Sequence, residues 1–298
     1  MITTINKFSE IIKGRYFSNE PMERHTTFRA GGRVGVLAEP ADAEDLKNIL
    51  KELMFSNLTW KVIGNGSNIL AGDTGLPDVV IKLSNINTLN AEGNTVTAYS
   101  GVALGRLVNY CAERGLSGSE FLAGIPGVVG GSIKGNTGAQ GKSIAEILKE
   151  IIIMDNNGNV FNVKGDEIPF SYRSSGLPDH YIVLGGVFSF ASGDKDSIKN
   201  LARSYLARRK EIFPTEPNAG CVFKNPKDMS AGKIIDRLGL KGFTIGKAMV
   251  SSNHANIIVN LGGACAMDVA SLMRYVQDEV YKKTEIRLEP EIIFWGDV

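Results

Sequence analysis

The feature that most constrains this chain is a glycine-dense segment between Gly118 and Gly141, in a sequence of 298 residues with 34 glycines. The segment has almost no apolar periodicity, and glycine at this density permits positive φ angles and close approach of the backbone. Ordered loops of this length are uncommon unless they serve a function. The pattern predicts a loop or a series of turns that another group approaches closely. A long connection whose glycines serve only packing is the alternative.

A second glycine-rich loop, Gly64-Asn-Gly66-Ser-Asn-Ile69, follows the expected short strand at residues 60–63. Backbone N–H groups in such a turn can converge on a phosphate or pyrophosphate. The loop is not a dinucleotide fingerprint, because Ile69 stands where the third glycine belongs and no strong helix pattern follows. Taken alone it reads as a hairpin turn, but two such loops in one domain favour a phosphate-bearing cofactor.

Strand and helix patterns alternate around these loops and indicate an α/β or α+β chain. The expected helices cover residues 42–53, 103–114, 196–210, 231–238 and 267–283, with Gly115 as a C-cap. The expected strands cover residues 60–63, 79–83, 96–99, 151–154, 160–163, 181–190, 255–259 and 286–294. The segment Phe213-Pro-Thr-Glu-Pro217 breaks the basic helix that precedes it, so we expect a last domain to begin near residue 208.

Composition excludes several classes of protein. The net charge of +1 offers no broad positive surface for nucleic acid or for an anionic membrane. No segment approaches the roughly 18 apolar residues of a membrane span, and residues 1–17 lack the features of a signal peptide, so we expect a cytoplasmic protein. Cys111, Cys221 and Cys265 are odd in number and widely spaced, as are the three histidines, which predicts neither disulfides nor a metal site.

Six motifs together resemble the UDP-N-acetylenolpyruvoylglucosamine reductases, and the resemblance covers about residues 25–296. In chain order they are Thr27-Phe-Arg-Ala-Gly31-Gly32, Gly64-Asn-Gly-Ser-Asn-Ile-Leu70, Gly124-Ile-Pro-Gly with Gly130-Gly131, Ser171-Tyr-Arg173-Ser-Ser, Ala219-Gly-Cys-Val-Phe-Lys-Asn225-Pro and Leu288-Glu-Pro-Glu291. The resemblance implies an α+β fold. An FAD-binding domain of the vanillyl-alcohol-oxidase (PCMH) type, in two subdomains at residues 1–83 and 84–207, would precede a smaller α/β substrate-binding domain at residues 208–298. The chain resembles the shorter form of the family, because it has no insert for an additional tyrosine-bearing loop.

The resemblance also implies the activity. NADPH would reduce non-covalently bound FAD, and the reduced flavin N5 would give a hydride to the enolpyruvyl group of UDP-N-acetylglucosamine enolpyruvate, producing UDP-N-acetylmuramate for peptidoglycan synthesis and cell-wall biogenesis. The enzyme would be a cytoplasmic monomer that binds these small molecules but no nucleic acid, membrane or metal. The residues implied to bind FAD are Gly64, Asn65, Gly66, Ser67, Asn68, Ile69, Gly124, Ile125, Pro126, Gly127, Gly130, Gly131, Ser132, Asn136, Gly138 and Ala139.

Three residues match the family's catalytic positions. Arg173 offers a planar fork to the substrate carboxylate, where negative charge grows during the reaction; a surface arginine is the alternative. Glu291 would orient or share the proton on the intermediate; a strand carboxylate facing solvent is the alternative, and Glu289 is the decoy two residues away on the same strand face. Cys221 departs from the serine proton donor common in the family. A thiol is a stronger acid than a hydroxyl, although a lone cysteine is more often an inert apolar residue.

Four further residues are secondary candidates for the substrate site: Tyr172, Lys210, Asn225 and His254. Lys210 could meet a UDP phosphate as a point charge, whereas a partly buried structural role is an equal alternative for His254. Trp60 and Trp295 are assigned to packing. Two other functions stay open: a flavin oxidoreductase of the same fold acting on a small alcohol or sugar, which a flavin linked to His25 would favour, and a non-catalytic nucleotide-binding module.

Overall fold

The computed structural model describes residues 11–297, so residues 1–10 of the segment without signal-peptide features lie outside the described part. Contacts divide the chain into two compact units. The first contains residues up to Ser18 together with residues 36–64 and 78–208, and the second contains residues 19–35, 65–77 and 209 onward. The second unit therefore collects two early segments of the chain around its C-terminal part. The domain ranges 1–83, 84–207 and 208–298 stay predictions.

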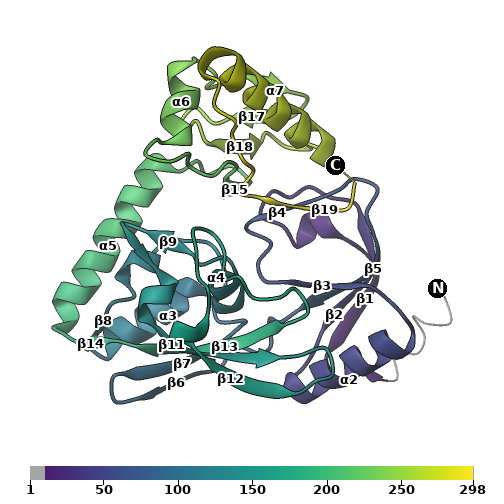
Figure 1. The fold of residues 1–298 in the computed structure, drawn as a ribbon, viewed down its shortest axis with the longest axis vertical. Coiled ribbons are helices and arrows are strands. Elements are labelled where there is room, and N and C mark those ends of the chain that lie inside the picture. The colour runs from purple at the N-terminus through teal and green to yellow at the C-terminus, as the bar shows by residue number, and fades with distance from the viewer. Residues whose placement is uncertain (1–10, 298) are drawn as a thin grey trace. The chain divides into compact units, whose positions relative to one another are not determined.

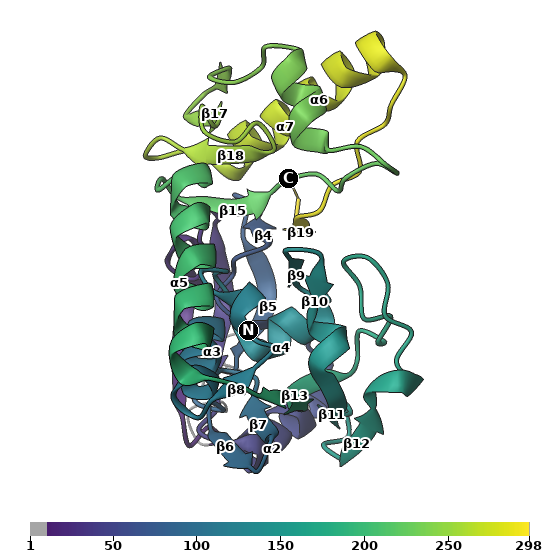
Figure 2. The same ribbon diagram turned by 90° about the vertical axis from the view of Figure 1, so that its left-hand side faces the viewer.

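A five-stranded antiparallel sheet organises the first unit, in the order β12-β11-β13-β7-β6. Its strands are β6 (Leu89–Glu92), β7 (Thr95–Tyr99), β11 (Leu148–Met154), β12 (Val160–Lys164) and β13 (Ile182–Ser189). Helices α3 (Leu104–Glu113) and α4 (Val129–Lys134) cover one face of this sheet, as Figures 1 and 2 show. Leu107 and Val108 of α3 and Ile133 of α4 share one apolar core with Ile151 and Phe188 of the sheet.

A second sheet has the order β1-β2-β5-β3. Its strands are β1 (Arg15–Pro21), β2 (Arg33–Glu39), β3 (Trp60–Ile63) and β5 (Leu76–Lys82), and β3 runs parallel to β5. Helix α2 (Ala43–Phe55) packs against it through Leu46, Ile49 and Leu53. The side chain of Asp42 accepts a hydrogen bond from the N–H of Asp45 and begins this helix, as the sequence predicts.

The remaining elements of the first unit are short, apart from α5 (Lys195–Ile212), whose last residues belong to the second unit. They are β8 (Leu116–Ser117) paired with β14 (Ala191–Ser192), β9 (Gly138–Ala139) paired with β10 (Lys142–Ser143), and the 3₁₀ turns η2 (Glu120–Leu122), η3 (Ile144–Ile147) and η4 (Gly165–Glu167). The hairpin of β9 and β10 directly follows α4 in the chain.

A four-stranded antiparallel sheet in the order β15-β18-β17-β16 organises the second unit. Its strands are β15 (Asn218–Cys221), β16 (Thr244–Ile245), β17 (Ala248–Val250) and β18 (Ile257–Asn260), with helices α6 (Ala231–Arg237) and α7 (Ala266–Thr284). The unit also holds the 3₁₀ turn η1 (Met22–Arg24) and the parallel pair β4 (Ile69–Ala71) and β19 (Ile293–Trp295), which lie side by side in Figure 1. Phe28 and Leu70 join the apolar core of this unit, which carries early and late segments in one packed body.

Two expected elements differ from the structure. The expected strand at residues 286–294 is wrong for most of its length: β19 covers only Ile293–Trp295, and Pro290 makes an isolated bridge with Phe223. Proline has no N–H to donate to a ladder, and a side chain, Gln277 Nε2, donates to the C=O of Leu288 at 2.7 Å. The segment 118–141, expected to be a loop or turns, contains the helix α4. A helix of six residues is too short to give a recognisable apolar periodicity.

Candidate functional site

The two glycine-rich loops pack against each other in the first unit. A Cβ atom on Gly64 would lie 2.4 Å from Val128 Cγ2, so only glycine allows the end of β3 to approach this loop so closely. A Cβ on Gly130 would similarly lie 2.4 Å from Ser100 Oγ. Part of the glycine density therefore serves packing, and that packing brings the Gly64 and Gly124–Gly131 loops together.

Other positions of the second loop face open space. A Cβ on Gly131 would meet no atom within 4 Å, and Gly131 is exposed. Asn136 follows in the left-handed conformation (φ +41°), and its Oδ1 atom is buried without a hydrogen-bond partner among residues 11–297. A buried acceptor without a donor is costly, and a bound group can supply the donor. An open backbone cradle beside such an acceptor fits the FAD that this loop is implied to bind.

The rest of the first glycine loop belongs to the second unit. Gly66 is buried with φ +61°, and a Cβ there would lie 2.1 Å from the C=O of His25. Asn68 ties this loop to the predicted catalytic glutamate: its Nδ2 atom donates to the C=O of Glu291 at 3.1 Å. The chain continues into β4 rather than into a helix, which confirms that the loop is not a dinucleotide fingerprint.

The other residues implied to bind FAD take varied positions in these loops. Asn65, Gly124 and Pro126 are exposed, and Ser67, Ile125 and Gly127 are half-buried. Ser132 is a buried residue of α4, Ile69 is buried in β4, and Gly138 and Ala139 form β9.

Arg173 sits in a tight turn of the first unit. The N–H of Ser171 donates to the C=O of Ser174 at 2.9 Å, and the N–H of Ser174 donates to the C=O of Ser171 at 3.2 Å. Arg173 lies between them with φ +60°, a left-handed conformation that is unusual for a non-glycine residue. Its guanidinium lies 5.6 Å from the ring centroid of Tyr172, which is itself exposed. Strained conformations of this kind cluster at functional sites, where the surroundings impose them.

Cys221 follows a β-bulge in the second unit. Asn218 pairs with Val259 and Cys221 pairs with Ile257, so β15 has one residue more than β18 between these pairs. Gly220 supplies the positive φ of +73° that the bulge requires, and its N–H donates to Asn218 Oδ1 at 2.9 Å. The bulge re-aims the half-buried Cys221, so the glycine before it is a structural requirement of the motif.

Glu291 lies just before β19, on a segment that hydrogen-bonds to the residue after Cys221. The N–H of Glu291 donates to the C=O of Val222 at 2.8 Å, and the N–H of Lys224 donates to the C=O of Glu289 at 2.8 Å. Glu291 is half-buried, whereas Glu289 is exposed and pairs with Lys224 at 3.3 Å. The structure thus holds the segment of Glu291 beside that of Cys221, and it distinguishes the half-buried Glu291 from the exposed Glu289.

Asn256 holds the cysteine strand and was missed by sequence reasoning. It is 2% exposed; its Oδ1 accepts from the N–H of Phe223 at 3.0 Å, and its Nδ2 donates to the C=O of Phe223 at 2.8 Å. Its own C=O accepts from the N–H of Val222 at 2.9 Å. The buried side-chain amide of Asn256 therefore makes the two hydrogen bonds with the backbone of Phe223 that a neighbouring strand would otherwise make. The only signal in the sequence was a polar residue within an otherwise apolar run.

The secondary candidates take structural roles or lie on the surface. The Oδ1 atom of Asn225 accepts from the N–H of Ala231 at the start of α6, at 3.0 Å. His254 packs 5.5 Å from the ring of Phe213, and its Nδ1 accepts from the N–H of Asn256 at 3.3 Å. Burial lowers the pKa of His254, and the positive charges of Lys241 and Arg209 act in the same direction. Lys210 is exposed on α5.

Several other predictions can be compared with the structure. Cys111, Cys221 and Cys265 form no disulfide, and residues 11–297 contain no group of three or more His, Cys, Asp or Glu side chains that could hold a metal. His25 contacts Glu20, with 3.1 Å between Nε2 and Oε1. Trp295 is buried and Trp60 packs against the core beside α2, as predicted. No helix among the described residues is both long and apolar enough to cross a membrane.

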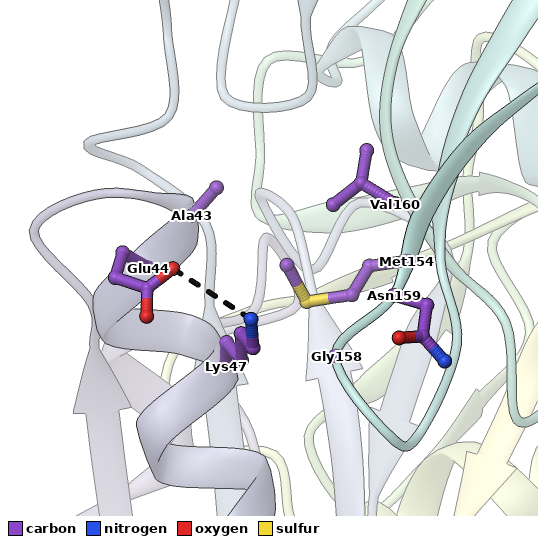
Figure 3. Close-up of a pocket in the computed structure, with 7 residues that line it drawn as sticks. All are labelled: Ala43, Glu44, Lys47, Met154, Gly158, Asn159 and Val160. Carbon is purple, nitrogen blue, oxygen red and sulfur yellow. Dashed lines mark ion pairs between the residues drawn. The ribbon is translucent and has the colours of Figure 1, made fainter.

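A surface pocket lies elsewhere in the first unit, between α2 and the turn that joins β11 to β12 (Figure 3). Its volume is about 360 Å³, and its lining residues are Ala43, Glu44, Lys47, Met154, Gly158, Asn159 and Val160. Glu44 and Lys47 form an ion pair at 4.0 Å, one helical turn apart on the surface. None of the predicted site residues lines this pocket, so it is separate from the candidate site.

The fold and the two loops define a flavoprotein of the PCMH type. Residues 34–164 match the model of an FAD binding domain. A berberine bridge enzyme variant described as a reticuline dehydrogenase has a similar fold, with a TM-score of 0.52 and 14% identity over 64% of this chain and 44% of that one. The chain thus has an FAD-binding domain and the fold of this class of flavoproteins.

The particular family follows from the rest of the chain. Residues 213–295 match the model of the UDP-N-acetylenolpyruvoylglucosamine reductase C-terminal domain. The enzyme of that name from Caldanaerobacter subterraneus is 38% identical over 98% of both chains, and that from Halalkalibacterium halodurans is 39% identical over 94% of both. The crystal structure of the Thermus caldophilus enzyme has a TM-score of 0.81 and 34% identity, covering 96% of this chain and 100% of that one. The chain belongs to the UDP-N-acetylenolpyruvoylglucosamine reductase family.

Proposed function

We propose that this chain reduces the enolpyruvyl group of UDP-N-acetylglucosamine enolpyruvate to the lactyl ether of UDP-N-acetylmuramate, with NADPH as the hydride source and FAD as the cofactor. The observation that carries the proposal is the backbone ladder that holds Cys221 and Glu291 on adjacent segments. These two residues come from motifs that lie 70 positions apart in the sequence. Their placement together is what a reaction requiring a proton donor and a carboxylate needs.

The glycine loops would hold the cofactor. Gly131 leaves open space for a ligand against the backbone, and the buried Oδ1 of Asn136 can accept a hydrogen bond from it. Bound FAD supplies a hydride carrier between NADPH and the substrate double bond. The residues of this chain therefore have to bind the substrate, stabilise the charge that develops on it and deliver one proton.

Three side chains divide this work. Arg173 binds the substrate carboxylate as a planar, permanently charged fork, an interaction that strengthens as negative charge grows beside it. Cys221 donates its thiol proton to the carbon next to the one that receives the hydride, so that the double bond is saturated. Glu291 orients the reacting group from the neighbouring segment. The thiolate left on Cys221 recovers a proton from solvent, which completes one turnover.

Two half-reactions separate these roles. Flavin reduction by NADPH needs no proton from Cys221, so Cys221→Ala should reduce its flavin at nearly the wild-type rate. Loss of a positioned acid should slow reoxidation by the substrate about 10²- to 10⁴-fold. Cys221→Ser restores the hydroxyl common in the family and should retain much more activity than Cys221→Ala. Stopped-flow flavin absorbance, recorded for each half-reaction, measures both effects.

Cys265→Ala is the matched control, because Cys265 is an exposed thiol in the same unit. It should behave as the wild type in both half-reactions. Normal turnover by Cys221→Ala would refute the thiol assignment, and a protein that purifies without flavin and cannot be loaded with FAD would refute the function itself.

The proposed enzyme acts as a cytoplasmic monomer on small molecules alone. Three cysteines that form no disulfide fit a reducing compartment. Sedimentation velocity of the FAD-loaded protein tests the oligomeric state: a species well above the chain mass of 32.1 kDa would contradict a monomer.

A further inference from the structure

The side-chain amide of Asn136 has one atom that hydrogen-bonds within residues 11–297 and one buried atom that does not. Its Nδ2 atom donates to the C=O of Ser171 at 2.9 Å, across 35 positions of sequence. A carbonyl oxygen only accepts hydrogen bonds, so the amide nitrogen must face Ser171 and Oδ1 must face away. That Oδ1 atom is buried, and no donor for it exists within residues 11–297. The Asn136 amide therefore holds one segment of the protein while an acceptor on its other side is left for a bound group.

The segment that Asn136 holds is the turn carrying Arg173. The two backbone hydrogen bonds between Ser171 and Ser174 close this turn around Tyr172 and Arg173. The N–H of Ser175, which is 1% exposed, donates to the C=O of Lys134 at 3.0 Å. The last residue of α4 thus holds the chain just after the turn, whereas Asn136 holds its first residue.

The side chain of Lys134 also binds the residues that follow this turn, at positions 177–179. Its Nζ donates to the C=O groups of Leu177 and Pro178 at 2.7 and 3.0 Å, and it pairs with Asp179 at 3.2 Å. A left-handed arginine is held in place only when its surroundings over-determine it. Asn136 and Lys134, which flank Gly135 at the end of the cofactor loop, supply that constraint.

We propose that Asn136 is a positioning residue that couples the bound cofactor to Arg173. Its Nδ2 fixes the Ser171–Ser174 turn, and its Oδ1 accepts a hydrogen bond from an N–H or O–H group of FAD. Binding of the cofactor then locks the Asn136 amide and, through it, the arginine that binds the substrate. This inference rests on the proposed function, because it takes FAD as the ligand of the loop and Arg173 as the group that contacts the substrate.

Two variants separate the two sides of the amide. Asn136→Gly removes both contacts and tolerates φ +41° without strain. Asn136→Asp keeps an acceptor of the same shape toward the cofactor, tolerates the left-handed conformation, and puts a carboxylate oxygen against the C=O of Ser171. Asn85→Ala is the matched control, because Asn85 Nδ2 also donates to a backbone C=O, that of Pro40, at 3.0 Å in the same unit.

The first readout is FAD affinity, measured by flavin fluorescence on apoprotein, because it requires no turnover. Loss of one neutral hydrogen bond should raise the Kd for FAD about 3- to 10-fold in Asn136→Gly. Asn136→Asp should stay closer to the wild type than Asn136→Gly does, and Asn85→Ala should match the wild type.

The second readout is amide hydrogen exchange of Ser171 and Ser174 with and without FAD. FAD should slow this exchange in the wild type and in Asn85→Ala, but not in either Asn136 variant. In steady-state kinetics both Asn136 variants should show a raised KM for the enolpyruvyl substrate and a lowered kcat, while flavin reduction by NADPH is retained. A merely structural asparagine would not make turn protection depend on FAD.

The outcomes distinguish this inference from the proposed function. If the wild type binds FAD and reduces the substrate, but Asn136→Gly and Asn136→Asp match it in FAD affinity and in turn protection, the coupling is overturned and the function stands. If Asn136→Gly does not fold by circular dichroism, Asn136→Asp alone decides: wild-type protection of the turn in that variant overturns the coupling. A wild-type protein that binds no FAD overturns both.

Discussion

The contact between Gly64 and Val128 provides a test of how the cofactor loops are held. A Cβ atom on Gly64 would lie 2.4 Å from Val128 Cγ2, whereas ordinary contacts begin at 3.4 Å, so the overlap is roughly 1 Å. Gly64 follows β3, which is fixed by parallel pairing with β5. The overlap in Gly64→Ala should therefore push the Val128 loop outward and disturb the surface that we propose binds FAD.

Overpacking of this kind costs about 1–3 kcal/mol. If the loop must return to its native position for FAD to bind, that cost raises the Kd about 5- to 150-fold. Val128→Ala removes the overlapping methyl group, so the double variant should bind FAD within about 3-fold of Val128→Ala alone. In the double-mutant cycle of wild type, the two single variants and the double variant, the FAD binding free energies should give a favourable coupling of about 1–2 kcal/mol between positions 64 and 128.

Flavin fluorescence titration of the four proteins measures this coupling, and chemical unfolding reports any general loss of stability. Gly105→Ala is the control: Gly105 lies in α3 of the same unit, a Cβ there meets nothing within 4 Å, and alanine favours a helix. It should leave FAD affinity unchanged. Wild-type FAD affinity in Gly64→Ala, or no rescue by Val128→Ala, would refute the packing argument.

Three further predictions concern the second unit and the thiols. Asn256→Ala should leave the buried N–H and C=O of Phe223 unsatisfied and lower the free energy of unfolding by about 2–5 kcal/mol, whereas exposed Asn253→Ala should change it by under about 0.5 kcal/mol in urea unfolding. Because burial lowers the pKa of His254, the unfolded state takes up its proton first as the pH falls below about 6.5. The free energy of unfolding therefore falls as the pH drops from about 6.5 to the lower pKa that His254 has in the folded protein. His254→Gln should remove this part of the pH dependence of unfolding. Burial also raises the pKa of Cys111 to about 11, so at pH 8 a thiol reagent should label exposed Cys265 in the native protein but Cys111 only after unfolding, and native labelling of Cys111 would contradict its burial.

Local patterns predicted the regular elements well where periodicity was strong. The helices at α2 and α3, the cap at Asp42 and every strand of the five-stranded sheet except β6 follow directly from neighbouring residues, because apolar spacing and capping act within a few positions. The prediction failed at residues 286–292, where Pro290 interrupts an alternation of apolar and polar residues that otherwise resembles a strand. The short helix α4 was missed because glycines separate its apolar positions Val129 and Ile133, so that no helical pattern is recognisable.

The candidate site was predicted in part. The motifs singled out Arg173, Cys221 and Glu291, and the structure distinguishes Glu291 from Glu289 by burial and by the ion pair of Glu289 with Lys224. No pattern revealed the asparagine contacts. Asn136 reaches Ser171 across 35 positions, Asn256 reaches Phe223 across 33, and Asn68 reaches Glu291 across 223.

By itself the sequence determined the alternation of helices and strands, the balance of charge and the order of the family motifs, because each depends on residue types close together in the chain. Only the tertiary structure decided that β4 pairs with β19, that residues 65–77 pack with the C-terminal unit, and that side-chain amides hold the segments of the predicted site residues. These choices depend on burying apolar surface and satisfying polar groups between segments far apart in the chain, and local propensity carries no information about such partners.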